Sequence, residues 1–283
     1  MLRFMSLSSG SCGNCYFLTD GKSGLVIDAG VSLRRLKKTL QDRGFSLDSF
    51  QAILVTHDHL DHIRHLGAWC KHLGKPVYAT QVLHDALAFH SFTRDWIAPC
   101  RRVLDGGNNL LELLPGLPLE DQPSVHPFIV PHDATQTVGY SIEWHGFRFF
   151  LMTDAGRVTD EALELAGKAD AVVIESNYDM GMLIGGPYTH QLKMRICKGN
   201  GHLSNEECAE AVRRMWHPGL RNIFLCHLSE NNNTPSLAFE ASASALRSIK
   251  ADGGLTAKDI TNLQTLPRST PSCIYDFYHY ISE

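Results

Sequence analysis

Four residues that can bind metal ions lie close together, at His57, His59, Asp61 and His62. They follow the apolar run 52–55, which is typical of a buried strand, and precede residues 63–74, where apolar side chains repeat at helical spacing. Alternate side chains of an extended chain point the same way, so the first two histidines share a face. Imidazole suits zinc and its first-row neighbours, and carboxylate also accepts manganese. Because burying such groups merely for packing is costly, the stretch predicts a site for one or two cations.

The ends of the other predicted strands indicate further metal-ligand residues at the same site. Apolar runs end on or just before five ligand-type residues, which are Asp28, His57, His132, Asp154 and His227. Open sheets carry their functional residues at the carboxyl ends of strands, so we expect these side chains to meet. The strands alternate with predicted helices at 33–43, 63–74, 81–89, 159–167, 191–198, 204–216 and 237–250. This order indicates an α/β protein, and we expect a single domain over residues 1–283.

Composition limits the class of protein. The 283 residues are 43% hydrophobic and can bury a sizeable core. A net charge of −4 argues against holding nucleic acid by overall positive charge, although a local basic groove stays open. No apolar run approaches the length of a membrane span, and residues 1–20 lack a signal-peptide pattern. With eight cysteines read as reduced thiols, these features predict a cytoplasmic protein with no membrane partner.

Three further segments carry possible chemistry. The loop 8–14 is small and polar and could form an anion-binding nest, but it lacks the Gly-Lys-Ser/Thr of a P-loop. Residues 180–201 are rich in glycine and indicate a lid or substrate loop with a short helix. His202 precedes a capping box made by Ser204 and Glu207, so it lies at a helix N-terminus. It is either a surface histidine or a group that acts on substrate.

The spacing His-x-His-x-Asp-His at 57–62 resembles the signature of the metallo-β-lactamase fold. The chain is further similar to the YycJ/WalJ-like branch, bacterial single-domain hydrolases related to the nucleases of that superfamily. The segments that carry this resemblance are 8–14, 130–134, 153–156, 175–177, 201–205 and 227–232. It implies a four-layer αββα sandwich of the α/β (α+β) class. The β-CASP nucleases insert a domain after the aspartate that matches Asp154, but here a short helix and a strand follow at once, so no β-CASP insertion is expected.

The resemblance also assigns roles to residues. It implies two divalent ions, zinc or manganese, one held by three histidines and one by a mixed set, with Asp154 bridging. The first set is His57, His59 and His132, and the second is Asp61, His62 and His227. Asp28 would orient a metal-bound histidine. Asp61, Asp154 and His202 are the expected catalytic residues. The expected substrate contacts are Ser11, Asn14, Asn177, Lys193 and Arg195.

Two metal ions at such a site favour hydrolysis with water as the nucleophile. No Gly-x-Ser-x-Gly elbow is present, which argues against a serine hydrolase. The first hypothesis is a phosphodiesterase, an exonuclease acting on DNA, with no stable protein partner. The second is a small-molecule hydrolase of the lactonase or thioesterase type, and the third is a metal-binding module without turnover. For DNA, cationic residues should line a groove, and the candidates are Arg34, Arg35, Lys193, Arg195, Lys198, Arg213 and Arg214.

Overall fold

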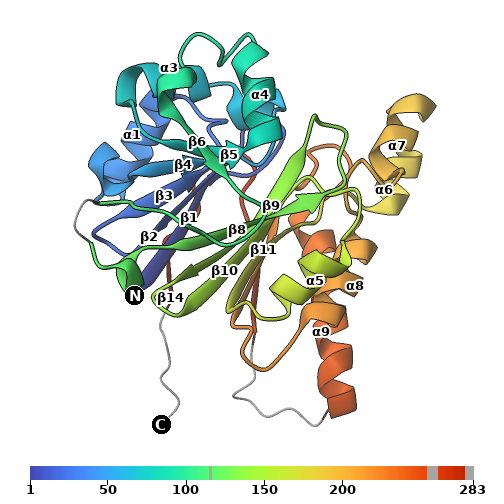
Figure 1. Ribbon diagram of the computed structural model, residues 1–283. Coiled ribbons are helices and arrows are strands. Elements are labelled where there is room, and N and C mark those ends of the chain that lie inside the picture. The colour runs from blue at the N-terminus through green and yellow to red at the C-terminus, as the bar shows by residue number, and fades with distance from the viewer. Residues whose placement is uncertain (115–116, 254–260, 278–283) are drawn as a thin grey trace, which may run out of the picture.

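The computed structural model describes residues 1–114, 117–253 and 261–277. Within these residues two seven-stranded sheets pack face to face, and helices cover both outer faces (Figure 1). The expected four-layer αββα sandwich is therefore confirmed. No separate domain interrupts it after Asp154, because one short helix alone lies between the strands that flank this residue.

The first sheet is built from the N-terminal half of the chain and one C-terminal strand. Four neighbouring strands at one edge pair in parallel, and the other pairs are antiparallel. In spatial order they are β14 (Tyr275–Phe277), β1 (Leu2–Ser8), β2 (Cys15–Thr19), β3 (Gly24–Ile27), β4 (Ala52–Leu54), β5 (Val77–Thr80) and β6 (Arg101–Leu104). The outer face carries α1 (Leu33–Asp42), α3 (Leu66–Leu73) and α4 (Gln81–Phe89).

The second sheet uses the remaining strands. In spatial order they are β13 (Asn262–Thr265), β12 (Asn222–Cys226), β11 (Ala171–Glu175), β10 (Phe147–Met152), β9 (Thr137–Trp144), β8 (Ser124–Val130) and β7 (Asn109–Leu110). Its outer face carries α5 (Asp160–Ala166), α8 (Asn205–Met215) and α9 (Pro235–Gly253). Two short helices, α6 (Met180–Gly185) and α7 (His190–Cys197), stand away from both sheets at one end of the sandwich (Figure 1).

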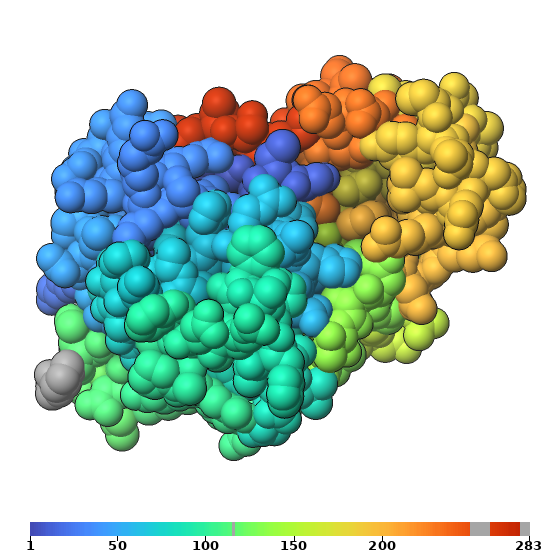
Figure 2. Space-filling model, turned by 90° about the horizontal axis from the view of Figure 1, so that it is seen from above, coloured from blue at the N-terminus to red at the C-terminus, as the bar shows by residue number. Residues whose placement is uncertain are grey.

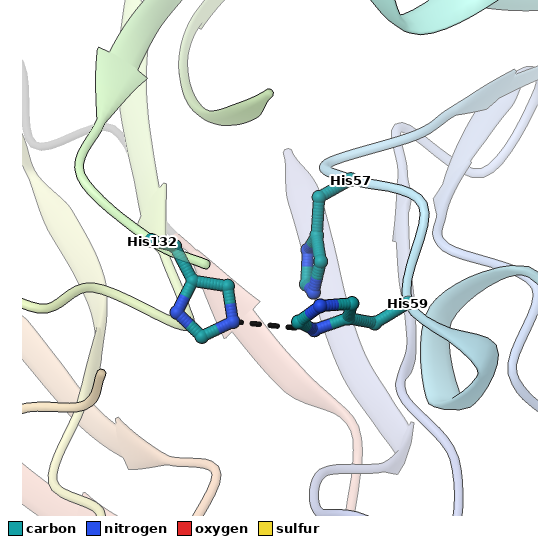
Figure 3. Close-up of side chains that lie close together, drawn as sticks. All are labelled: His57, His59 and His132. Atoms are coloured by element: carbon teal, nitrogen blue, oxygen red, sulfur yellow. Dashed lines mark hydrogen bonds between the residues drawn. The ribbon is translucent and has the colours of Figure 1, made fainter. Parts of the chain in front are cut away.

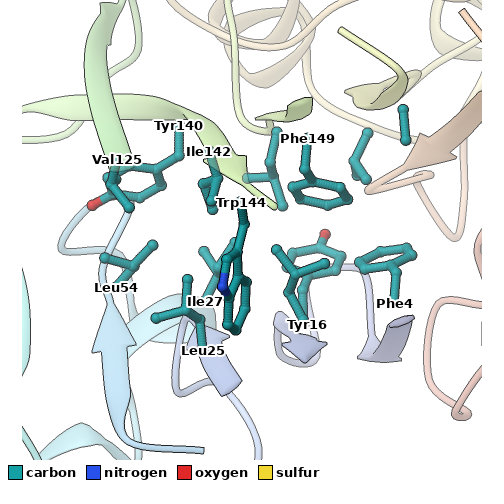
Figure 4. Close-up of a cluster of buried hydrophobic side chains, with 14 of the residues drawn as sticks. Phe4, Tyr16, Leu25, Ile27, Leu54, Val125, Tyr140, Ile142, Trp144 and Phe149 are labelled. Atoms are coloured by element: carbon teal, nitrogen blue, oxygen red, sulfur yellow. The ribbon is translucent and has the colours of Figure 1, made fainter. Parts of the chain in front are cut away.

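The space between the sheets is filled by large apolar side chains from both of them (Figure 4). Phe4 of β1 packs on Phe149 of β10, with ring centroids 5.1 Å apart. Tyr16, Tyr140 and Trp144 are also buried there. Each such side chain stabilises the fold by roughly 1.5–3 kcal/mol relative to exposure. This core fixes the sheets against one another, so loops at the ends of their strands keep fixed positions.

Several elements differ from the sequence expectation. The predicted helix 63–74 is two helices, α2 (Leu60–Ile63) and α3, because the amide of His65 bonds to the carbonyl of Ala29 and the chain turns there. Residues 180–185 form a helix where only a loop was expected, and β6, β7, β13 and β14 were not predicted. The predicted hairpin of β9 and β10 is confirmed, and its turn has φ of +52° at His145 and +74° at Gly146, the mirror-image turn that such hairpins favour.

Candidate metal centre

Three polar residues leave the sheets in an unusual backbone conformation. Asp28, Asp154 and His227 follow β3, β10 and β12 and have φ of +64°, +52° and +52°. Among the described residues His145 is the only other non-glycine residue with positive φ. Such a conformation costs about 1–3 kcal/mol and persists where surrounding contacts enforce it. All three residues therefore mark the strand ends where the two sheets meet as the functional end of the molecule.

Three histidines converge at this end. His57 follows β4, His59 begins α2 and His132 follows β8, and their ring nitrogens lie within 4.8 Å of one another (Figure 3). His132 donates through Nδ1 to the carbonyl of Gly201 at 2.7 Å, which directs its Nε2 toward His59 at 3.3 Å. Burial lowers the pKa of His57 well below its usual range, so this ring is neutral and can bind metal.

The Nε2 atom of His57 tests whether a metal ion fits. It is buried, and no hydrogen-bond partner for it exists among the described residues. A buried polar nitrogen left unpaired costs about 1–3 kcal/mol. A cation held by the three rings would satisfy this nitrogen together with those of His59 and His132. The group therefore fits a divalent ion with nitrogen ligands.

A second group lies beside the first and contains Asp61, His62, Asp154 and His227, again with ligand atoms within 4.8 Å of one another. His62 Nε2 lies 3.1 Å from Asp154 Oδ2, and His227 Nε2 lies 3.4 Å from Asp61 Oδ2. Asp154 Oδ1 is also 3.9 Å from Nε2 of His132, so this carboxylate lies between the two groups. A carboxylate in that position can bind ions on both sides.

The charges of the second group also fit a cation. Burial lowers the pKa of His227, but Asp154, Asp61 and Glu175 outweigh it and raise the pKa to about 10. The pKa of His62 is likewise raised, because burial is outweighed by Asp28, Asp61 and Asp154. Protons on these rings balance the buried carboxylates. A divalent ion can supply that positive charge in their place.

Asp28 contacts His62 as expected of a carboxylate that orients a ligand. His62 Nδ1 donates to Asp28 Oδ2 at 2.6 Å, which directs Nε2 of the same ring toward Asp154. The backbone amide and the hydroxyl of Thr56 also donate to Asp28, each at 2.8 Å. The carboxylate is fully buried, so these three donors replace its hydration.

Glu175 is the main residue that the sequence reasoning did not single out. It ends β11 and is fully buried. One oxygen accepts from Nδ1 of His202 at 2.8 Å and Nδ1 of His227 at 2.9 Å, and the other accepts from the amides of Ala155 and Leu203. A signal was available, because the strand 171–175 ends on a carboxylate just as its neighbours end on ligand-type residues.

His202 is part of this end of the molecule. Its Nδ1 is 2.8 Å from Glu175 and 3.6 Å from Asp154, and its side chain lines the cavity beside the ligand groups. Burial lowers its pKa, but Glu175 and Asp154 outweigh burial and raise it. Of the two alternatives left open by the sequence, the isolated surface histidine does not fit this position.

A cavity of about 250 Å³ lies over the ligand groups, and the expected substrate contacts divide around it. Ser11, Asn177 and Arg195 line the cavity. Asn14 instead is buried below it and donates to Asp61 Oδ2 at 3.0 Å. Lys193 is turned away, because its ammonium donates to the carbonyls of Ile184 and Gly186 at 2.6 and 2.8 Å. Both residues therefore support parts of the site rather than line it.

The loop 8–14 lies at the same end. Besides the Asn14 contact, the amide of His227 donates to Ser9 Oγ at 2.9 Å. The loop that could form an anion-binding nest therefore lies beside the second ligand group. Its role is to brace the residues of both sheets, since Asp61 belongs to the first-sheet half and His227 follows a strand of the second.

The seven cationic residues do not form the single groove that was considered. Arg35 of α1 donates to the carbonyls of Leu7 and Ser269, at 2.7 and 2.8 Å. Arg213 and Arg214 lie on α8, on the other outer face of the sandwich, and pair with Glu210 and Asp160 (Figure 1). Arg195 is the one that lines the cavity, where it pairs with Asp133. Positive charge is therefore spread over both outer faces.

None of the helices in the described part of the chain combines the length and the apolar character that a membrane crossing requires.

Comparison with known proteins agrees with this geometry. The family model described as "Beta-lactamase superfamily domain" matches residues 24–227. Exodeoxyribonuclease WalJ of Streptococcus pneumoniae is 32% identical over 236 residues, which cover 83% of this chain and 85% of that protein. Exodeoxyribonuclease YycJ of Bacillus anthracis is 30% identical over 250 residues, covering 84% of this chain and 86% of that protein.

Solved structures show the same fold. The metallo-β-lactamase fold protein YhfI from Bacillus subtilis superposes with a TM-score of 0.66 at 13% identity, covering 97% of this chain and 98% of that chain. Zn²⁺-bound PqqB from Methylobacterium extorquens superposes with a TM-score of 0.67 at 19% identity, covering 97% and 100%. The sandwich, the ligand groups at its strand ends and these matches agree. The chain belongs to the beta-lactamase superfamily, as a metal-dependent hydrolase with the metallo-β-lactamase fold.

Proposed function

We propose that this protein is an exodeoxyribonuclease that hydrolyses phosphodiester bonds of DNA with two divalent metal ions, zinc or manganese. The observation that carries the proposal is the pair of adjacent ligand groups that share Asp154. They occur in a chain matched over more than four-fifths of its length by proteins named exodeoxyribonucleases. Paired metal sites are common among enzymes that cleave phosphodiesters.

The ligand assignment follows the two groups. His57, His59 and His132 would hold one ion, and Asp61, His62 and His227 would hold the other. Asp154 would contact both ions. When bound, divalent ions lower the pKa of water and neutralise charge on a phosphate. Asp28 and Glu175 keep His62 and His227 turned toward the centre by accepting from their Nδ1 atoms.

The protein's own groups can position substrate and move protons. Glu175 accepts from Nδ1 of His202, so Nε2 is the atom free to face a phosphate oxygen or protonate the leaving oxygen. Asn14 donates to Oδ2 of Asp61, which leaves Oδ1 of this carboxylate to accept a hydrogen bond from water. Ser11, Asn177 and Arg195 lie around the cavity where a phosphate would sit.

The variant His202→Ala removes the imidazole that would contact the phosphate. It should slow cleavage without removing metal, because His202 is not one of the proposed metal ligands.

The test uses the purified protein loaded with manganese or zinc. Elemental analysis should find close to two ions per chain, as the two groups require. End-labelled DNA should lose nucleotides from an end. His57→Ala should lose metal and activity, because it removes a ligand. His126→Ala is the matched control, since His126 lies on β8 and contacts Asn108 and Glu161 at the surface.

Two results would contradict the proposal. Full metal content and activity in His57→Ala would rule out the ligand assignment. Intact DNA beside a hydrolysed lactone or thioester would instead establish the small-molecule alternative on the same centre.

A further inference from the structure

The cavity over the ligand groups is lined by apolar as well as polar side chains. Asp61, Asp154 and His227 line the cavity with polar groups. Another segment lines it with Tyr188, Leu192 and Ile196, together with Arg195, and these first three residues are called the apolar wall here. These three residues belong to the segment that contains α6 and α7. Seen from above, this segment, in yellow, stands beside a hollow whose other side is formed by blue and teal atoms of the N-terminal half (Figure 2). The cavity therefore offers apolar surface beside its polar groups.

The apolar wall is fixed relative to the ligand groups. The hydroxyl of Tyr188 accepts from Nδ2 of Asn231 at 2.9 Å, and Asn231 follows His227 by four residues. The carbonyl of Ile196 accepts from the amide of His202 at 2.9 Å. Contacts therefore hold both ends of the wall to segments that carry a ligand or His202.

The three side chains of the apolar wall are not needed to pack α6 and α7 against the rest of the protein. The buried side chain of α6 and α7 is Leu183, which is only 1% exposed. Tyr188, Leu192 and Ile196 stay half-buried and face the cavity. Lys193 ties α7 to the end of α6 through the carbonyls of Ile184 and Gly186, which stiffens the segment. The three side chains are thus available to a ligand.

We propose that Tyr188, Leu192 and Ile196 form a subsite for the base of the terminal nucleotide, whose phosphate lies on the metal centre. The inference rests on the proposed function and adds the recognition of the chain end. The cavity of about 250 Å³ is smaller than the roughly 300–1,000 Å³ of typical ligand pockets, which suits one nucleotide rather than a run of stacked bases.

The chemistry of the wall also indicates how it recognises a base. Every nucleobase has a flat face that stacks on an aromatic ring, so Tyr188 can bind any of the four. The apolar side chains of Leu192 and Ile196 offer no donors or acceptors to read base edges. The subsite therefore selects a terminal nucleotide without selecting its sequence.

The test measures binding rather than turnover. The zinc- or manganese-loaded protein is titrated by calorimetry with 5′- and 3′-deoxynucleoside monophosphates, and separately with deoxyribose 5-phosphate, which lacks the base. A stacked base should tighten binding about ten-fold over the sugar phosphate. Tyr188→Ala should remove most of this difference with the metal content unchanged. Tyr188→Phe keeps the ring and loses only the bond from Asn231, so it should keep most of the difference.

Controls separate the possible failures. Phe89→Ala removes an aromatic side chain that is 85% exposed on α4 and should change nothing. If Tyr188→Ala does not fold, Ile196→Ser tests the same wall. Equal binding of the mononucleotides and the sugar phosphate to the unmodified protein overturns the subsite, whether or not DNA is cleaved. Base-dependent binding in a protein that leaves DNA intact supports the subsite and contradicts the proposed function.

Discussion

Asp154 is the residue on which the two ligand groups converge. Its Oδ2 lies 3.1 Å from His62, and its Oδ1 lies 3.3 Å from His227 and 3.9 Å from His132. Asp28 is a natural comparison, because it is also a buried aspartate with positive φ after a strand. It differs in contacting the centre only through His62 and Thr56.

Replacing each aspartate by asparagine should show which of the two binds metal directly and which supports a ligand. Asparagine keeps the shape and tolerates positive φ, so both variants should fold. Asp28→Asn should lower activity by about 10- to 100-fold with metal largely retained, as expected when a supporting partner is lost. Asp154→Asn should lose more activity and most of the metal. Parallel measurements of metal content and hydrolysis check this. A larger loss in Asp28→Asn, with both proteins folded, would mean that the roles are reversed.

At the scale of elements, the candidate metal centre depends on two loops, after β1 and β3, whose backbones are in close contact with the segment that contains Asp61. The amide of Asn14 donates to the carbonyl of Asp61 at 2.7 Å, and the amide of Gly30 donates to the carbonyl of Asn14 at 2.9 Å. A Cβ atom on Gly30 would overlap the carbonyl oxygen of Asp61 and the backbone of Asn14. The loops after β1 and β3 therefore set the position of α2 and its two ligands.

Gly30→Ala should displace the segment that contains Asp61 and His62. Because the overlap is with backbone atoms, the loops must move rather than a side chain. We expect metal affinity to fall at least ten-fold and the unfolding temperature to drop. Gly106→Ala is the matched control, since no atom lies within 4 Å of its added Cβ. Unchanged metal affinity in Gly30→Ala would show that the loop packing does not position the ligands.

At the scale of the whole molecule, a chain with net charge −4 must bind a polyanion through a few placed cations. Arg195 lines the cavity at the surface, where its partner is Asp133. Lys193 lies two residues earlier on the same helix, yet its ammonium is held by backbone carbonyls. These two cations are therefore expected to act differently on DNA.

The salt dependence of DNA binding should distinguish them. Arg195→Gln should weaken binding and make the plot of log affinity against log salt shallower by about one unit, because one phosphate contact and its released counterion are lost. Lys193→Gln should leave the slope unchanged. Fluorescence anisotropy at several salt concentrations, in a metal-loaded Asp28→Asn background whose hydrolysis is slowed, provides the measurement. An equal change of slope in both variants would place Lys193 on the phosphates as well.

The sequence by itself determined the candidate ligand residues and the class of fold. The motif at 57–62 and the polar residues at strand ends were visible because ligand types are rarely placed after buried apolar runs for packing alone. Alternation of strand and helix patterns was enough to expect an α/β protein, since hydrophobic periodicity is a local property, whereas the four-layer sandwich was implied by the family resemblance. Even the capping box at Ser204 and Glu207 is present as predicted, because capping depends on residues three apart.

Only the tertiary structure decided what each polar group contacts. Glu175 was passed over because its four donors come from three separate segments, and no local pattern reports such contacts. Lys193 and Arg195 are two residues apart in sequence, but helix rotation turns one toward backbone carbonyls and the other toward the cavity. The apolar wall at Tyr188 likewise exists only because the segment with α6 and α7 lies beside the cavity at the strand ends. Contacts between distant segments depend on the packed sheets, and that packing is a property of the whole chain.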